Sequence, residues 1–267
     1  MNRSRIGLGV IAVATAGILA LAGCSQGAGD AGGSGGGDTS AIITTNGSEP
    51  QSALIPTMVN EVGGGKILDA MFAGLVYYDA KGAPHNDIAT SIESNDAINY
   101  TIKIRDDAKF TDGTTVKAKN FVDAWNYGAA LDNAQLNSYF FEDIEGFSYD
   151  ENVPELSGLK VVDDTTFTVT LNKAASDFPL RLGYSAYFPL PDSAWDDLEA
   201  YGQAPIGNGP YKIGEGDAWK HNEEIALVKN DDYNGPREVK NGGLTIKFYV
   251  SLDAAYSDIL SGNLDVI

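Results

Sequence analysis

Cysteine and histidine are almost absent from this chain of 267 residues, which contains only Cys24, His85 and His221. A single cysteine cannot form a disulfide within the chain. The two histidines do not have the spacing of paired metal ligands, so a histidine-rich metal centre and a Ser-His-Asp hydrolase are both poorly supported. The Gly-x-Ser-x-Gly spacing occurs only at residues 32–36, inside a glycine-rich segment without the strand and helix that would present a nucleophilic serine. We therefore expect no catalytic residue, no metal site and no cofactor.

Basic residues are also scarce. The chain has 18 lysines and arginines against 37 aspartates and glutamates, a formal net charge of −19 at pH 7. Such a surface repels the phosphates of nucleic acid, so we expect no nucleic-acid partner. It is compatible with a cationic or zwitterionic ligand, although solubility alone also explains an acidic surface.

Two familiar motifs are present only as fragments. Residues 230–235 have the spacing of the first half of a calcium loop, but Asn241 stands where the bidentate glutamate belongs. Gly207-Asn208-Gly209 lacks the third glycine of a dinucleotide-binding loop. Acidic pairs such as Asp106-Asp107 lie in turn-like sequence. We interpret all of these as turns.

The amino-terminal segment has the features of an export signal. Arg3 and Arg5 precede a run of apolar and small residues from Ile6 to Ala22. Leu21-Ala22-Gly23-Cys24 resembles the bacterial lipobox, which implies a signal peptide over residues 1–23 and a lipid on Cys24. Residues 24–40, rich in glycine and serine, predict a flexible linker with a reach on the order of 20 Å. A membrane-spanning anchor is the alternative, and the shortness and glycine content of the apolar run weaken it.

Residues 88–127 carry the clearest folding pattern. Apolar and polar residues alternate from Tyr100 to Arg105, which predicts a strand with one buried face. An acidic turn containing Asp112-Gly113 follows. From Thr115 onward the apolar residues recur at helical spacing, which predicts an amphipathic helix packed on that strand. The side chains expected in the core are Tyr100, Phe110, Phe121 and Trp125.

Other elements follow from the same reasoning. Strands are expected at residues 41–45, 76–78, 159–162, 166–171, 211–213, 225–230 and 244–250, and short helices at 178–182 and 253–260. Gly63-Gly64-Gly65 interrupts a helical pattern, so we place the start of that helix near Lys66. Residues 184–191, which end in two prolines, are expected to be extended.

Several ordered motifs together resemble a known family. They are Tyr100-Thr101-Ile102-Lys103-Ile104-Arg105, Asp112-Gly113-Thr114, Asn120-Phe121-Val122 with Trp125, Gly207-Asn208-Gly209-Pro210-Tyr211, and Gly262-Asn263-Leu264-Asp265. The set is similar to solute-binding protein family 5, the peptide-, dipeptide- and nickel-binding receptors of ABC importers. The chain departs from the family at Ile55, where an aspartate is usual, and at Asn234, where a tryptophan is usual.

The resemblance implies an α/β fold of the periplasmic-binding-protein-like class II type. It assigns residues 41–267 to the first lobe, with an inserted subdomain at about 67–158. The second lobe and its return strand are missing from the sequence, so we expect a fragment of a longer protein.

The resemblance also implies a function. The chain is expected to belong to a monomeric lipoprotein on the outer face of the cytoplasmic membrane, which captures oligopeptides or dipeptides for an ABC permease. Nickel chelates, haem and oligosaccharides are alternative ligands, and an anchored extracellular hydrolase is the alternative from another class. The residues expected to line the ligand cleft are Gly47, Glu49, Tyr184, Tyr187, Asn208 and Tyr249.

Overall fold

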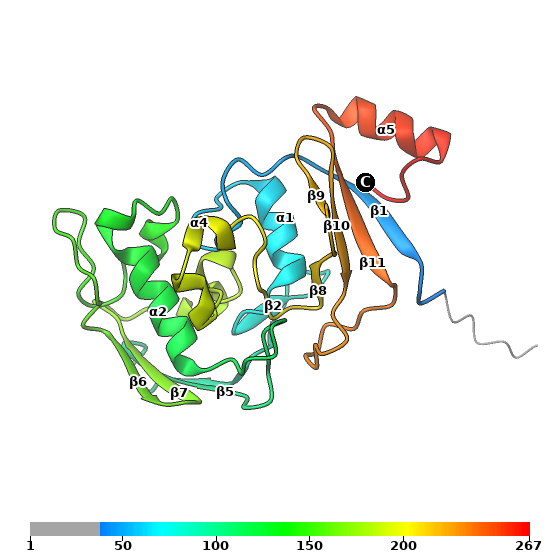
Figure 1. Ribbon diagram of the computed structural model, residues 1–267. Helices are drawn as coiled ribbons and strands as arrows, with labels where there is room; N and C mark the ends of the chain where they lie inside the picture. The colour runs from blue at the N-terminus through cyan, green and yellow to red at the C-terminus, as the bar shows by residue number, and fades with distance from the viewer. Residues whose placement is uncertain (1–37) are drawn as a thin grey trace, which may run out of the picture. The chain divides into compact units, whose positions relative to one another are not determined.

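A parallel pair of strands joins the two ends of the described chain. The computed structural model describes residues 38–267, so the expected signal peptide, Cys24 and most of the linker lie outside the described residues. β1 (Ile42–Gly47) pairs with β11 (Gly243–Phe248), with Ile42 opposite Gly243 and Gly47 opposite Phe248. Figure 1 shows the two strands side by side. Because the pair is parallel, the segments that follow both strands emerge at the same edge of the sheet.

Three further strands complete this five-stranded sheet. β10 (Glu224–Lys229) pairs antiparallel with β11, and β8 (Tyr211–Ile213) and β9 (Trp219–Lys220) both pair antiparallel with β10. β8, β10 and β11 confirm the strands expected at residues 211–213, 225–230 and 244–250, whereas β9 was not expected. Val266 adds an isolated parallel bridge to Thr45 of β1.

A second sheet forms the other layer of the fold. Its strands are β4 (Ala89–Glu93), β5 (Asn99–Ile104), β7 (Thr166–Thr170) and β6 (Leu159–Asp163), in that spatial order and all antiparallel. β6 and β7 follow residue 158, and the described residues fall within one compact unit. The bounds of the inserted subdomain, about 67–158, stay a prediction.

Helix α2 (Ala118–Ala129) packs on the second sheet, mainly against β6 and β7 rather than against the predicted strand β5. The ring of Phe121 stacks on Phe167 at 5.9 Å, and Trp125 meets the same ring edge-on at 5.5 Å. The helix begins three residues later than Thr115 because Asn120 Oδ1 accepts a hydrogen bond from the Lys117 backbone N–H at 2.8 Å. All four aromatic side chains expected in the core are buried.

Helix α1 (Val62–Met71) corrects one expectation, because the three glycines lie inside it. The Glu61 carboxylate accepts hydrogen bonds from the N–H groups of Gly63 and Gly64, at 2.6 and 2.8 Å, and so begins the helix before Lys66. Close packing requires two of the glycines. A Cβ on Gly63 would lie 2.5 Å from the Ser48 carbonyl oxygen, and one on Gly64 would lie 2.7 Å from Val59 Cγ1.

The remaining elements are short. They are β2 (Val76–Tyr78), β3 (Pro84–Asn86), α3 (Phe178–Arg181), α4 (Leu198–Tyr201), α5 (Leu252–Ser261) and 3-10 turns at Leu131–Asn133, Ser138–Phe141, Ser185–Tyr187 and Asp192–Trp195. The turn at Ser185–Tyr187 lies in the segment expected to be extended. It forms because Tyr187 turns inward, where its carbonyl accepts from Trp125 Nε1 and its hydroxyl donates to the Phe140 carbonyl.

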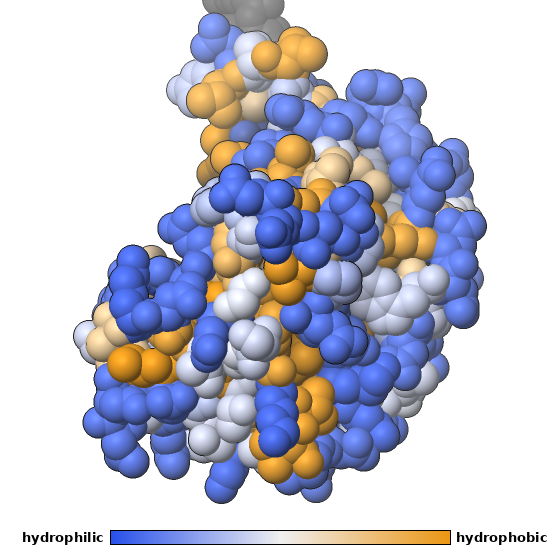
Figure 2. All heavy atoms as spheres, turned by 90° about the vertical axis from the view of Figure 1, so that its left-hand side faces the viewer, coloured by the Kyte–Doolittle hydropathy of each residue, from blue (hydrophilic) through white to orange (hydrophobic). Residues whose placement is uncertain are grey.

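The surface is mostly hydrophilic, as the large number of charged residues indicates. On the face shown in Figure 2, hydrophilic side chains dominate and the hydrophobic patches are separated from one another. Within residues 38–267, no helix has both the length and the apolar character needed to cross a membrane.

The glycines of α1 give a test of this packing. Gly65→Ala places a methyl group where no atom lies within 4 Å, so the better helix propensity of alanine should raise the free energy of unfolding by about 0.5 kcal/mol. Gly63→Ala should lower it by about 1–3 kcal/mol, because the backbone of Ser48 must move. Urea unfolding measures both, and equal effects of the two variants would contradict the packing described here.

Candidate ligand groove

A groove crosses the exposed face of α1. Its larger section, about 670 Å³, lies between α1, β2 and the segment around Tyr184. Its smaller section, about 380 Å³, lies between the amino-terminal turn of α1 and the segments that follow β1 and β11. Val62 and Lys66 line both sections. We call the two sections together the α1 groove.

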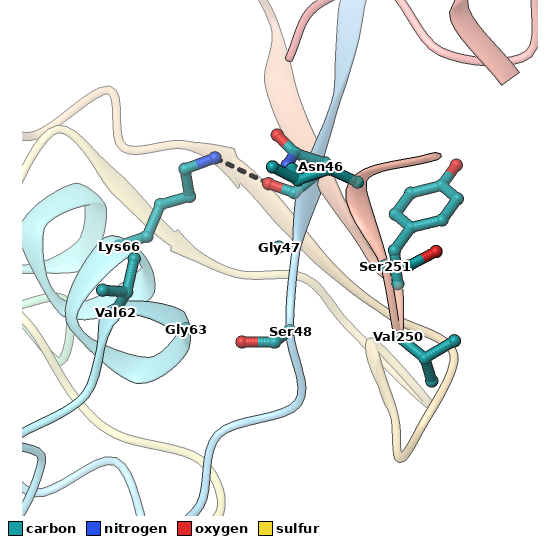
Figure 3. A pocket seen from close by; sticks show the side chains of 10 residues that line it. Asn46, Gly47, Ser48, Val62, Gly63, Lys66, Val250 and Ser251 are labelled. Atoms are coloured by element: carbon teal, nitrogen blue, oxygen red, sulfur yellow. Dashed lines mark hydrogen bonds between the residues drawn. The ribbon is translucent and has the colours of Figure 1, made fainter. Parts of the chain in front are cut away.

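The smaller section exists because β1 and β11 end at the same edge. Ser48 follows one strand, and Val250 and Ser251 follow the other, with α1 facing them across the hollow (Figure 3). Lys66 reaches across toward β1, where its Nζ donates to the Asn46 carbonyl at 2.6 Å. Burial lowers the pKa of Lys66. The lysine thus connects helix and strand at the point where the two sections meet.

The larger section contains several aromatic rings that the protein holds in place. Tyr184 stacks on Phe140, with centroids 4.3 Å apart, and Phe188 stacks on Phe72 at 5.9 Å. The Tyr78 hydroxyl donates to the carbonyl of Leu180. Because these rings are fixed before any ligand arrives, little side-chain entropy is lost when they bind one.

Arg237 closes one side of the larger section. Its Nε donates to Asp87 Oδ2 at 3.0 Å, and its terminal nitrogens donate to the carbonyls of Asp69 and Phe72 at the carboxyl-terminal end of α1. The Tyr233 hydroxyl donates to the same Asp87 carboxylate at 3.0 Å. Burial raises the pKa of Asp87, and Arg237 opposes that shift. The arginine therefore ties the loop after β10 to α1.

Three of the residues expected from the sequence lie on the α1 groove. Gly47 and Tyr249 line the smaller section, and Tyr184 lines the larger one. Gly47 packs against Ile246, leaving no room for a Cβ, and the Tyr249 hydroxyl donates to Asp258 Oδ2 at 2.7 Å. Burial and the Asp258 carboxylate raise the pKa of Tyr249 to about 12.

The other three lie elsewhere. Tyr187 has no exposed surface and packs against Trp125, and Asn208 is 2% exposed. The Asn208 side chain exchanges two 2.9 Å hydrogen bonds with the backbone of Ala73, so the turn that contains it has a packing role. Glu49 accepts from His221 Nδ1 at 2.7 Å, outside the groove lining. The positions of Tyr187 and Asn208 do not support their assignment to a ligand site.

Sequence reasoning missed the contribution of α1 to the groove. Val62, Lys66 and Asp69 are spaced i, i+4, i+7 and share the face opposite the buried Ile67, Leu68 and Met71. That amphipathic pattern is visible in the sequence once the helix is known to begin at Val62. Arg237 carries no such signal, because its role depends on contacts with residues distant in sequence.

No metal site is visible in the described residues. Within residues 38–267, no three histidine, cysteine, aspartate or glutamate side chains are grouped to hold an ion. Asn230 instead forms a turn, accepting from the Asp232 N–H at 3.2 Å and donating to the Gly209 carbonyl at 2.9 Å.

Comparison with known proteins identifies the family. The model of "Bacterial extracellular solute-binding proteins, family 5 Middle" matches residues 83–267. The chain belongs to this family. Its fold also matches solved members, including Listeria monocytogenes OppA bound to peptide, with a TM-score of 0.75, 25% identity, and coverage of 86% of this chain and 46% of that one. The expected α/β solute-binding fold is confirmed.

Two curated members of the family are similar in sequence. The chain is 30% identical over 233 residues to the oligopeptide-binding protein OppA of Bacillus subtilis, covering 83% of this chain and 42% of that protein. It is 30% identical over 250 residues to the periplasmic oligopeptide-binding protein OppA of Escherichia coli, covering 90% and 44%. The chain therefore spans less than half the length of these family 5 relatives.

The Arg237–Asp87 pair gives a prediction about stability. Arg237→Met leaves the carboxylate of Asp87, whose side chain has no exposed surface, without its cation, so the free energy of unfolding should fall by about 3 kcal/mol. Lys173→Met is the control, because Lys173 is 74% exposed and Arg181 still pairs with its partner Asp143. The control should change stability by less than about 0.5 kcal/mol. Equal losses in denaturant titrations would contradict this role for Arg237.

Proposed function

We propose that this chain contributes the first lobe of an extracytoplasmic receptor that captures oligopeptides or dipeptides and delivers them to the permease of an ABC importer. The observation that carries the proposal is the α1 groove, an aromatic and polar groove in a chain of family 5 whose matched relatives are named oligopeptide-binding proteins. A ligand would lie along α1, from the ends of β1 and β11 to Tyr184.

The groove suits a peptide better than a compact solute. Its two sections form one elongated surface past Val62 and Lys66, with polar groups near Ser48 and Ser251 and rings near Tyr184. Peptide receptors gain affinity from main-chain hydrogen bonds and tolerate varied side chains in wet pockets. In this proposal Gly47, Tyr184 and Tyr249 contact the ligand, and a second lobe closes over the peptide about a hinge.

Attachment to the membrane completes the proposal. Cys24 would carry the lipid after removal of residues 1–23, and the glycine-rich linker would hold the receptor close to the permease. The receptor would act as a monomer, without a cofactor or catalysis.

Native mass spectrometry of the full-length protein, released from its own membranes, tests the ligand class. We expect a series of peptide-sized adducts on the folded protein, because a receptor with wet, tolerant pockets retains a mixture of ligands. Adducts with the mass of a haem, a metal chelate or an oligosaccharide would contradict the peptide assignment. Hydrolysis of an added peptide by the pure protein would favour the hydrolase.

A bulky residue in the groove tests its location. Val62 is 85% exposed and lines both sections, so Val62→Trp should fill the groove and weaken peptide binding at least tenfold, about 1.4 kcal/mol. Val162→Trp is the control, because Val162 is 57% exposed on β6, away from the groove. Calorimetric titration with a co-purified peptide measures both variants. Unchanged affinity of the Val62 variant would place the ligand elsewhere.

A further inference from the structure

One carboxylate in the α1 groove has no partner within the described protein. Glu61, which also lines the groove, caps α1 through its carboxylate. Asp69 lines the larger section and is exposed, and among residues 38–267 its side chain forms no hydrogen bond and no ion pair. Arg237 binds only the backbone carbonyl of Asp69, through a hydrogen bond from its guanidinium.

The nearby cations are committed to other groups. Lys66 Nζ donates to the Asn46 carbonyl and points toward β1 (Figure 3). Arg237 Nε pairs with the buried carboxylate of Asp87, which offsets the charge of the arginine. The remaining contacts of Arg237 are with backbone carbonyls and the ring of Tyr233. The Asp69 carboxylate is thus available to a cation supplied by a ligand.

Aromatic rings line the same section of the groove as this carboxylate. They include Tyr78, Tyr184 and Phe188. Burial raises the pKa of Tyr184, and Tyr139 and the Asp69 carboxylate raise it further. Burial also raises the pKa of Tyr78. The backbone of Gly183 lowers this pKa through a hydrogen bond, and the Asp69 carboxylate raises it. The charge of Asp69 therefore acts on both rings, and one cation at this position would meet a carboxylate and aromatic faces together.

The carboxylate lies in the lining of the larger section. Burial raises the pKa of Asp69, with Arg237 opposing the shift, although the residue is open to solvent. Neighbouring protein atoms therefore desolvate the carboxylate partly, and it remains accessible from the groove. An ion pair in such a place is screened less than one on a convex surface.

We propose that Asp69, Tyr78 and Tyr184 form a subsite for the cationic side chain of a lysine or arginine in the bound peptide. The inference rests on the proposed peptide-binding function and specifies its selectivity. The alkyl stem of such a side chain lies along the rings and its charged head reaches the carboxylate, an arrangement that combines apolar contact, cation–π attraction and a charged hydrogen bond. An α-ammonium has no alkyl stem to cover the rings.

Matched peptides test the subsite on the full-length protein. The probes are tetra-alanine peptides in which one position, varied in turn, holds lysine or norleucine, which keeps the stem but removes the ammonium. Calorimetric titration should show at least a tenfold preference for lysine at one position. Asp69→Asn should reduce that preference to less than threefold and leave the norleucine affinity unchanged, which also shows that the variant is folded.

Asp196→Asn is the control, because Asp196 is an exposed acid outside the α1 groove, and it should keep the full preference. A preference for lysine that survives in Asp69→Asn, or equal binding of both peptides by the unmodified protein, would overturn the subsite while peptide binding itself stands.

Amino-terminal acetylation separates the two sources of positive charge on the peptide, the terminal ammonium and the lysine side chain. If acetylation removes the dependence on Asp69, the carboxylate binds the peptide terminus, and the assignment to a side chain is wrong. Failure of every peptide to bind would overturn the proposed function and the subsite together.

Discussion

The parallel pairing of β1 with β11 is the constraint on which the rest of the structure depends. β1 and β11, which lie far apart in the sequence, pair from Ile42 opposite Gly243 to Gly47 opposite Phe248. The chain between the two strands must therefore leave this sheet and return to it. Because parallel strands end at the same edge, Ser48 and Val250 emerge together, and α1 packs against that edge with Gly63 touching Ser48. The smaller section of the α1 groove is a direct consequence of this pairing.

Helix α1 uses opposite faces for packing and for lining the α1 groove. Ile67, Leu68 and Met71 are buried, while Val62, Lys66 and Asp69 face the groove. The helix is fixed at one end by the Glu61 cap and at the other by Arg237, which donates to its last carbonyls. A rigid element that carries groove residues holds them in place before a ligand arrives, which lowers the entropy lost on binding. The aromatic wall formed by Tyr184 and Phe188 is fixed in the same way, by stacking on Phe140 and Phe72.

Local pattern predicted most of the fold and less of the site. The alternation at residues 100–105 and the helical spacing after Thr115 identified β5 and α2, because both elements bury one regular face. The predicted start of α1 was wrong, because intrinsic helix propensity does not include the Glu61 cap or the close packing that requires a glycine at position 63. The family resemblance led us to expect Tyr187 and Asn208 in the ligand cleft, yet both side chains are buried in the protein. Side-chain direction in irregular segments depends on tertiary packing, which a local sequence pattern does not contain. Arg237 and Asp69 acquire their roles only through residues distant in sequence.

Hydrogen–deuterium exchange of the full-length protein with and without a co-purified peptide tests most directly whether the α1 groove is the proposed ligand surface. We expect the peptide to slow exchange in residues 46–48, 61–72, 183–188 and 249–252, which line the groove, and to leave the β6–β7 hairpin unchanged. Protection that is confined to other segments, with α1 unaffected while peptide is bound, would contradict the proposal.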